Sequence, residues 1–200
     1  AAGNTLEEAI LQGFFELVER DAVAMWWYNR VQRPAVDPNS FGERYLDQVA
    51  DFLTRRQRDL WVLDVTTDLD IPVFVAVSRR TQGPFEKIVL GFGAHFDPRV
   101  ALLRAVTELN QMLVYILDMD DENDLATTDP ATVDWLQTAA LENHPHLMPD
   151  ARILPRKLSD YPHRWTDDLR DDVLLCQRLV ERHGMEMLVL DQTRADIELP

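Results

Sequence analysis

The sequence predicts an α+β fold in which long helices pack on a mostly antiparallel sheet. Two long segments with helical apolar periodicity, at about 5–30 and 98–117, indicate the helices. β-rich runs separated by short polar turns indicate a three-stranded meander at 60–66, 71–79 and 86–92. Parts of the first half recur in the second half, so we expect two pseudo-repeated helix-plus-strand units, the second of them truncated.

The first helix is expected to begin at Thr5. Glu8 follows three residues later, just before an apolar run, and this spacing is the capping-box signature of a helix start. At about 100° per residue, polar side chains fall on one stripe of this helix and apolar ones on the other side. The polar stripe comprises Glu8, Gln12, Glu16 and Glu19, with Arg20 at its edge. Such a stripe is typical of the solvated side of an amphipathic helix, so alone it identifies no site.

The helix at 98–117 repeats the first at an offset of 92 residues, which aligns Glu16 with Glu108. It is apolar nearly all round, so we expect it to be buried. A narrow polar stripe interrupts it, formed by Arg104, Glu108, Gln111 and Tyr115. Buried groups of this kind need partners, because removing water from a lone charge is costly. The partners are either each other, as in a private ion pair between Arg104 and Glu108, or a bound metal or ligand.

The remaining elements follow from local patterns. Further helices are expected at 41–58, 131–141 and 167–183, with Gly184 as a C-cap. The closing run at 187–193 echoes 62–66, which suggests that the second unit stops where its next strand should begin. A sheet edge would then be open. An open edge favours pairing with another chain, so a homodimer is possible.

Composition excludes several classes of protein. A chain of 200 residues with 46% hydrophobic content suits one domain, or one large piece of one. The net charge of −15 argues against nucleic-acid binding. No apolar run reaches the roughly 18 residues of a membrane span, and no signal-peptide pattern is present. The single Cys176 cannot form an internal disulfide and is expected to be a small buried hydrophobe, which fits a cytoplasmic setting.

Weaker candidate sites lie elsewhere in the chain. The acidic run at 118–124 alternates like an EF-hand loop, but Asn123 stands where that loop needs Gly, so a solvated turn is expected. His144 and His146 could ligate a metal, although packing is the commoner role of such loop histidines. The run at 26–28, Trp-Trp-Tyr, could form a peptide-binding platform or simply pack at the end of the helix.

Phosphate binding would have to proceed without a P-loop, because no GxxxxGK[ST] motif is present. Clustered carboxylates repel phosphates directly, but they can hold Mg²⁺, which prefers oxygen ligands and bridges phosphate oxygens. Arg20 and Arg104 offer bidentate donors for those oxygens. The residue types are therefore compatible with a magnesium-dependent phosphate site.

Several motifs, in order along the chain, resemble the YcaO family and are most similar to its D-protein, or SagD-like, cyclodehydratases of thiazole/oxazole-modified microcin biosynthesis. They lie at 1–9, 16–22, 26–30, 91–95, 104–111 and 191–194. The resemblance implies that residues 1–200 are a central fragment of a single YcaO-like domain, with pseudo-repeats at roughly 1–92 and 93–200.

The resemblance also implies a set of site residues. Positions that match magnesium ligands of the family are Glu8, Glu16, Glu19 and Glu108. Positions that match nucleotide contacts are Asn4, Arg20 and Arg104, and Gln111 lies in the Glu-x-x-Gln motif of the most similar members. It assigns no catalytic residue, which stays unknown.

The implied activity is ATP- and Mg²⁺-dependent cyclodehydration of a peptide in bacteriocin biosynthesis. In the family, ATP phosphorylates a backbone amide oxygen during attack by a Cys, Ser or Thr side chain, and the departing phosphate leaves an azoline. The implied partners are a precursor peptide and a leader-peptide-binding C-protein of E1-like type. Two alternatives stay open: a relative that activates the amide for another nucleophile, as in thioamidation, and a non-enzymatic scaffold that binds the precursor peptide.

The chain opens on Ala-Ala-Gly without Met, which suggests an excised piece. In the family, part of the nucleotide site, including another Glu-x-x-Glu helix, precedes this region, and a Pro-rich tail follows it. We therefore expect the fragment alone to be inactive and to bind ATP weakly or not at all.

Overall fold

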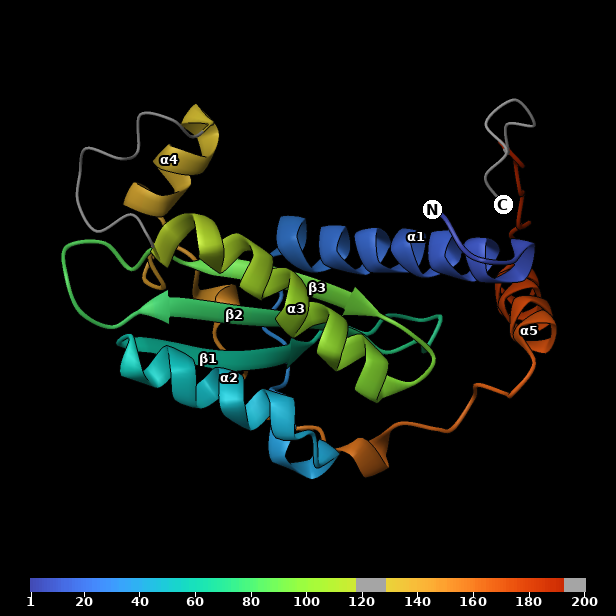
Figure 1. Ribbon diagram of the computed structural model, residues 1–200, viewed down its shortest axis with the longest axis horizontal. Helices are drawn as coiled ribbons and strands as arrows, with labels where there is room; N and C mark the ends of the chain where they lie inside the picture. Colours follow the sequence, from blue (N-terminus) through green and yellow to red (C-terminus); the bar gives the residue numbers. More distant parts are fainter. Residues whose placement is uncertain (118–128, 193–200) are drawn as a thin grey trace.

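A three-stranded antiparallel sheet in the order β1-β2-β3 lies between two layers of helices in the computed structural model, which describes residues 1–117 and 129–192 (Figure 1). The strands are β1 (Arg58–Asp64), β2 (Val73–Arg80) and β3 (Val89–Ala94). The α-helices are α1 (Leu6–Asn29), α2 (Arg44–Arg55), α3 (Pro98–Leu117), α4 (Pro130–Thr138) and α5 (Leu169–Arg182). Short 3₁₀ helices are η1 (Pro38–Phe41), η3 (Pro145–Leu147) and η4 (Leu158–Asp160). The predicted α+β class and meander are confirmed.

The sheet has a core on each face because side chains alternate along its central strand. Val73, Val75 and Val77 pack into a cluster with side chains of α1 and α5. Phe74 and Ala76 point the other way, into a cluster with α2 and α3. Helices α1 and α3 therefore lie on opposite faces of the sheet.

Helix α1 begins as predicted, with Thr5 as its N-cap. The Thr5 hydroxyl accepts a hydrogen bond from the Glu8 backbone N–H at 3.2 Å. The Glu8 carboxylate bonds Asn4 rather than Thr5, at 2.8 Å to the backbone nitrogen and 3.0 Å to the side-chain nitrogen. This arrangement satisfies backbone donors at the helix start that would otherwise lack partners.

Two glycines of β3 bring the strand against the backbone of α3. A Cβ atom built on Gly93 would overlap the carbonyl oxygen of Ala101, and one built on Gly91 would overlap the carbonyl oxygen of Ala105. Any larger residue would push α3 away from the sheet. These glycines therefore fix the position of the α3 side chains relative to β3.

Gly93→Ala is expected to lower the free energy of unfolding by about 3 kcal/mol or more, because the added methyl group meets rigid backbone rather than a flexible side chain. Thermal unfolding of the full-length protein measures the effect. Gly13→Ala, in α1, is the control: its Cβ would lie 3.4 Å from that of Ala1, an ordinary contact, so stability should stay equal or rise. Equal melting temperatures for the two variants would contradict the close packing of β3 on α3.

Some predicted boundaries were wrong. The helix expected at 41–58 is broken, because Gly42 adopts φ 68 after η1, and α2 begins only at Arg44. Helix α3 is not buried all round, since Met112 and Val114 are exposed. No strand forms at 185–192 in the described part of the chain, where the predicted echo of 62–66 has no adjacent strand to supply its hydrogen bonds. The acidic run at 118–124 lies outside the described residues.

The histidine and tryptophan residues after α1 form an aromatic cluster. Trp26 is buried, and His146 lies 5.3 Å from it between ring centroids. His144 stacks on Trp27 at 5.9 Å. Packing therefore explains these residues, and Tyr28, at 84% exposure, does not join them in a platform.

Burial raises the pKa of the Cys176 thiol to about 12, which confirms its packing role. None of the helices in the described ranges combines the length and apolar character needed to cross a bilayer.

Candidate functional site

A hollow of about 330 Å³ opens between α1 and α3 beside the outer edge of β3. Its lining combines side chains of the two helices that the sequence offset relates, with one strand residue between them. The lining residues are Gln12, Glu16, Glu19, Arg20, Phe92, Arg104, Thr107, Glu108 and Gln111. Six of the eight predicted site residues therefore meet in one place, although they come from opposite faces of the sheet.

Arg20 bridges the carboxylates of this hollow. Its Nε lies 2.9 Å from Glu16 Oε1, and its Nη2 lies 3.1 Å from Glu19 Oε1 and 3.9 Å from Glu108 Oε1. With Arg104, which also lines the hollow, two guanidiniums face three carboxylates, so the site carries at most one net negative charge, which favours a bound cation.

Glu19 is the most enclosed of the three acids, with only 7% of the residue exposed. The pKa of its carboxyl is raised from 4.5 to about 7, chiefly by burial and in smaller part by the charges of Glu108 and Glu16. Arg20 and Arg104 oppose this shift. An acid held partly protonated near neutral pH gains its full charge when a cation binds beside it.

Glu108 is oriented by the sheet edge. The backbone N–H of Phe92, which points away from β2, donates to Glu108 Oε2 at 2.5 Å. The Arg20 guanidinium also lies over the Phe92 ring, 5.8 Å from its centroid. Of the two alternatives for Arg104 and Glu108, the private ion pair is absent from the described structure, because each side chain has other partners.

Two neutral partners hold the guanidinium of Arg104, which forms no ion pair among the described residues. Its Nη2 donates to Gln12 Oε1 at 2.6 Å and its Nη1 donates to the Ala94 carbonyl oxygen at 3.1 Å. Burial lowers the pKa of this guanidinium, and the charges of Glu19 and Glu16 oppose that shift. Within the described ranges it forms no ion pair, so both neutral partners orient a cation that is free to bind an anionic ligand.

The donor set fits magnesium and a phosphate chain. Hard carboxylate oxygens of Glu16, Glu19 and Glu108 are the ligand type that Mg²⁺ prefers, and Arg104 supplies the guanidinium suited to phosphate. In this arrangement no three His, Cys, Asp or Glu side chains of the described residues converge closely enough to hold one ion. Mg²⁺ commonly keeps several waters and binds through one or two carboxylates and substrate phosphates, so such convergence is not required.

Two predicted residues lie away from the hollow. Asn4 and Glu8 bond each other at the start of α1. Eight residues of helix separate Glu8 from Glu16, a rise of about 12 Å. Their predicted roles toward ATP and Mg²⁺ stay predictions. The side chain of Tyr115 lies outside the described part of the chain.

Sequence reasoning did not assign three of the lining residues, Gln12, Phe92 and Thr107. Gln12 lies on the predicted polar stripe, one turn before Glu16, and its bond to Arg104 could have been suspected from that spacing. Phe92 contributes a backbone N–H and a ring face, for which the sequence carries no signal.

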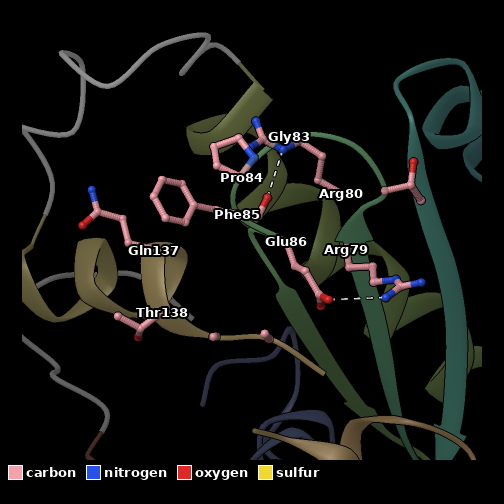
Figure 2. Close-up of a pocket in the computed structure, with 11 residues that line it drawn as sticks. Arg79, Arg80, Gly83, Pro84, Phe85, Glu86, Gln137 and Thr138 are labelled. Atoms are coloured by element: carbon pink, nitrogen blue, oxygen red, sulfur yellow. Dashed lines mark hydrogen bonds and ion pairs between the residues drawn. The ribbon is translucent and has the colours of Figure 1, made fainter. Parts of the chain in front are cut away.

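A second hollow, of about 350 Å³, lies between the β2–β3 connection and α4 (Figure 2). Arg79 pairs with Glu86 at 3.5 Å and with Asp59 at 3.1 Å, while the Arg80 side chain donates to the Phe85 carbonyl oxygen. Figure 2 shows Gln137 and Thr138 of α4 on the opposite side. None of the predicted site residues lies here, and its acidic groups are already paired with arginine.

Comparisons with known proteins place this geometry in context. A family model described as YcaO cyclodehydratase, ATP- and Mg²⁺-binding, matches residues 1–200. A protein of the tfuA 3′ region of Rhizobium leguminosarum bv. trifolii is 42% identical over 56% of this chain and 29% of its own length. A protein of Methanothermobacter thermautotrophicus is 25% identical over 100% of this chain and 52% of its own length.

Solved structures show the same fold. A heterocyclase in complex with substrate and cofactor has a TM-score of 0.91 and 55% identity, covering 98% of this chain and 26% of its own. The heterocyclase TruD has a TM-score of 0.88 and 54% identity, covering 98% and 26%. YcaO from Methanopyrus kandleri, bound with AMPPCP and Mg²⁺, has a TM-score of 0.67 and 23% identity over 92% of this chain, which shows the fold alone. The chain spans about a quarter of the length of the two heterocyclases.

Proposed function

The chain belongs to the YcaO family of ATP- and Mg²⁺-binding cyclodehydratases, and from this premise we propose that its α1–α3 hollow binds the phosphates of Mg·ATP in a protein that converts Cys, Ser or Thr residues of a peptide to azolines. The observation that carries the proposal is Arg104. It is a half-buried guanidinium without an ion pair among the described residues, aimed by Gln12 and Ala94 into a hollow of carboxylates. A phosphate chain with its cation complements both charges of the site.

The proposed reaction removes one oxygen from the peptide backbone. The thiol or hydroxyl attacks the preceding carbonyl carbon and loses its proton, the carbonyl oxygen takes the γ-phosphoryl group of ATP, and the amide nitrogen loses its proton as phosphate leaves. The products are the azoline, ADP and phosphate. Little covalent work falls to the protein, whose contribution is positioning and charge.

Each lining residue has a role in this proposal. Glu16, Glu19 and Glu108 would hold Mg²⁺, which would supply positive charge against the phosphates. Arg20 and Arg104 stabilise the negative charge on the phosphoryl group in transfer. Gln12 and the Ala94 carbonyl hold Arg104 in place, and Phe92 holds Glu108. The residues Asn4, Glu8 and Gln111 complete the proposed nucleotide and metal contacts.

The peptide substrate and its delivery belong to the same proposal. Relatives described as a heterocyclase in complex with substrate and cofactor and a microcin synthetase complex of several proteins support a peptide substrate and partner proteins. We assign a precursor peptide as substrate and a leader-peptide-binding C-protein of E1-like type as partner, in the cytoplasm. Residues 1–200 would form the central part of one YcaO-like domain, and a homodimer is the proposed assembly.

The full-length protein is expected to remove one water from a peptide with a single Cys, with one ATP converted to ADP and phosphate per ring. Mass spectrometry of the peptide and quantification of phosphate measure both. Chelation of Mg²⁺ and replacement of ATP by AMPPCP are the controls and should stop the reaction. Exchange of oxygen for sulfur without loss of water would favour thioamidation, and binding of the peptide without any ATP-dependent product would favour a scaffold.

A further inference from the structure

The outer edge of β3 carries backbone groups whose partners differ along its length. Because the bonds to β2 use alternate residues, Ile88, Leu90, Phe92 and Ala94 direct their backbone groups outward. Side chains cover both ends of this edge. Trp135 Nε1 donates to the Ile88 carbonyl oxygen at 2.8 Å, while Glu108 accepts from the Phe92 N–H and Arg104 donates to the Ala94 carbonyl oxygen.

The middle of the edge is uncovered. The N–H and C=O of Leu90 and the C=O of Phe92 have no hydrogen-bond partner within residues 1–117 and 129–192. Native sheets usually protect such edges with charge, proline or a bulge, because unpaired backbone groups recruit another strand. Here only the two ends of the edge are protected, which leaves between them a gap long enough for one short peptide segment.

This gap leads into the α1–α3 hollow. Phe92 belongs to both, since its N–H contacts Glu108 and its ring contacts Arg20. A strand paired with Leu90 must leave the edge at Phe92, because the next outward donor, the Phe92 N–H, already donates to Glu108. Its following residue then enters the space bordered by Glu19 and Arg104.

We propose that the β3 edge at Leu90–Phe92 binds the peptide substrate as an added β-strand and delivers its reacting carbonyl to the phosphate site. The inference rests on the proposed function and describes how that site binds its peptide substrate. Backbone hydrogen bonds to Leu90 accept any sequence, and the half-buried side chains of Leu90 and Phe92 favour apolar or small residues at alternate positions. The carboxylates of the hollow disfavour acidic residues beside the reacting one.

The experiment uses the full-length protein and a synthetic probe, a run of alternating Ala and Val before a single Cys, with one backbone nitrogen methylated at a time. Every second residue of an added strand directs its N–H to the protein. Methylation at those positions should therefore raise the dissociation constant and the KM about tenfold, while the intervening positions should stay within about twofold and serve as matched controls. Fluorescence anisotropy of labelled probe without ATP gives the affinity independently of turnover.

The outcomes separate this inference from the proposed function. Alternating losses in affinity without ATP-dependent loss of water would support the added strand and contradict the proposed reaction. Turnover of the unmethylated probe with a flat or irregular methylation profile would overturn the added strand and leave the reaction standing.

A protein variant tests the other hydrogen bond of the same residue pair, in which the Leu90 N–H donates to a carbonyl oxygen of the peptide. Leu90→Pro removes the outward N–H but no hydrogen bond to β2, so the sheet tolerates it on an edge. Peptide affinity should fall about tenfold, and methylation should then cost much less, because the two changes remove the same pairing. A change of oligomeric state with unchanged peptide affinity would show that a second copy occupies the edge instead. If the variant fails to fold, the methylation profile of the wild-type protein alone tests the proposal.

Discussion

Glu19→Gln in the full-length protein is expected to lower the rate of ATP-dependent ring formation by about 10²- to 10³-fold and, at the same time, to make the protein more stable at pH 8. Loss of rate follows because an amide cannot supply the charge that holds Mg²⁺ beside the phosphates. Gain in stability follows because a buried carboxylate surrounded by Glu16 and Glu108 is unfavourable in the folded state. Few substitutions are expected to move activity and stability so far in opposite directions.

The sign of the stability effect comes from the raised pKa of Glu19. The folded protein holds its proton up to a pKa of about 7, while the unfolded chain releases it near 4.5. Wild-type stability therefore falls as the pH rises from 4.5 to 7, and the full penalty, at most about 3 kcal/mol, is present above pH 7. Gln carries no such penalty, so the variant should match wild type below pH 4.5 and exceed it at pH 8.

Thermal unfolding at a series of pH values, with and without Mg²⁺, measures the effect. Mg²⁺ should stabilise wild type at pH 8 more than Glu19→Gln, because the variant keeps only Glu16 and Glu108 to hold the cation. Asp21→Asn is the matched control, an exposed carboxylate two residues along the same helix with the same change of charge. If Asp21→Asn and Glu19→Gln show the same pH dependence, the enclosure of Glu19 is not its cause.

The sequence offset between α1 and α3 predicted the composition of the site better than its shape. Glu16 and Glu108 are equivalent by that offset and do line one hollow. The offset could not show that the two helices lie on opposite faces of the sheet and meet only around the edge of β3. That arrangement depends on Gly91 and Gly93, whose role is a close backbone approach.

Local competition explains the residues that sequence reasoning misplaced. Glu8 lies on the same polar stripe as Glu16, but the donors at the start of the helix are nearer, and it bonds Asn4. A private ion pair between Arg104 and Glu108, one turn away, was one of the two alternatives that the sequence left open. A backbone N–H from Phe92 and a side-chain oxygen from Gln12 take those positions instead. Periodicity gives the face on which a side chain lies, and tertiary contacts decide its partner.

Arg104→Ala is expected to lower kcat by about 10²- to 10³-fold. The guanidinium is the one group of the hollow that carries positive charge without an ion pair among the described residues, so its charge is available to a phosphoryl group in transfer. Arg104→Lys should recover only part of the rate, because an ammonium cannot bond Gln12 and the Ala94 carbonyl while presenting a planar fork to phosphate. Arg99→Ala, at the start of the same helix, is the control and should keep wild-type kcat, because Arg99 lies 3.9 Å from Glu43 and does not line the hollow.

The same substitution should change how the reaction depends on pH. Arg104 lowers the pKa of Glu19, so its removal raises that pKa above about 7 and leaves more Glu19 protonated at neutral pH. The Mg²⁺ concentration needed for half-maximal rate should then rise at pH 7 more than at pH 9, where the carboxylate is charged in either protein. Combining Arg104→Ala with Glu19→Gln should cost less than the product of the separate losses, because both act on one magnesium-phosphate site. Fully multiplicative losses, with a magnesium requirement that does not depend on pH, would show that the two residues act independently. Arg104 would then contact the peptide rather than the phosphates.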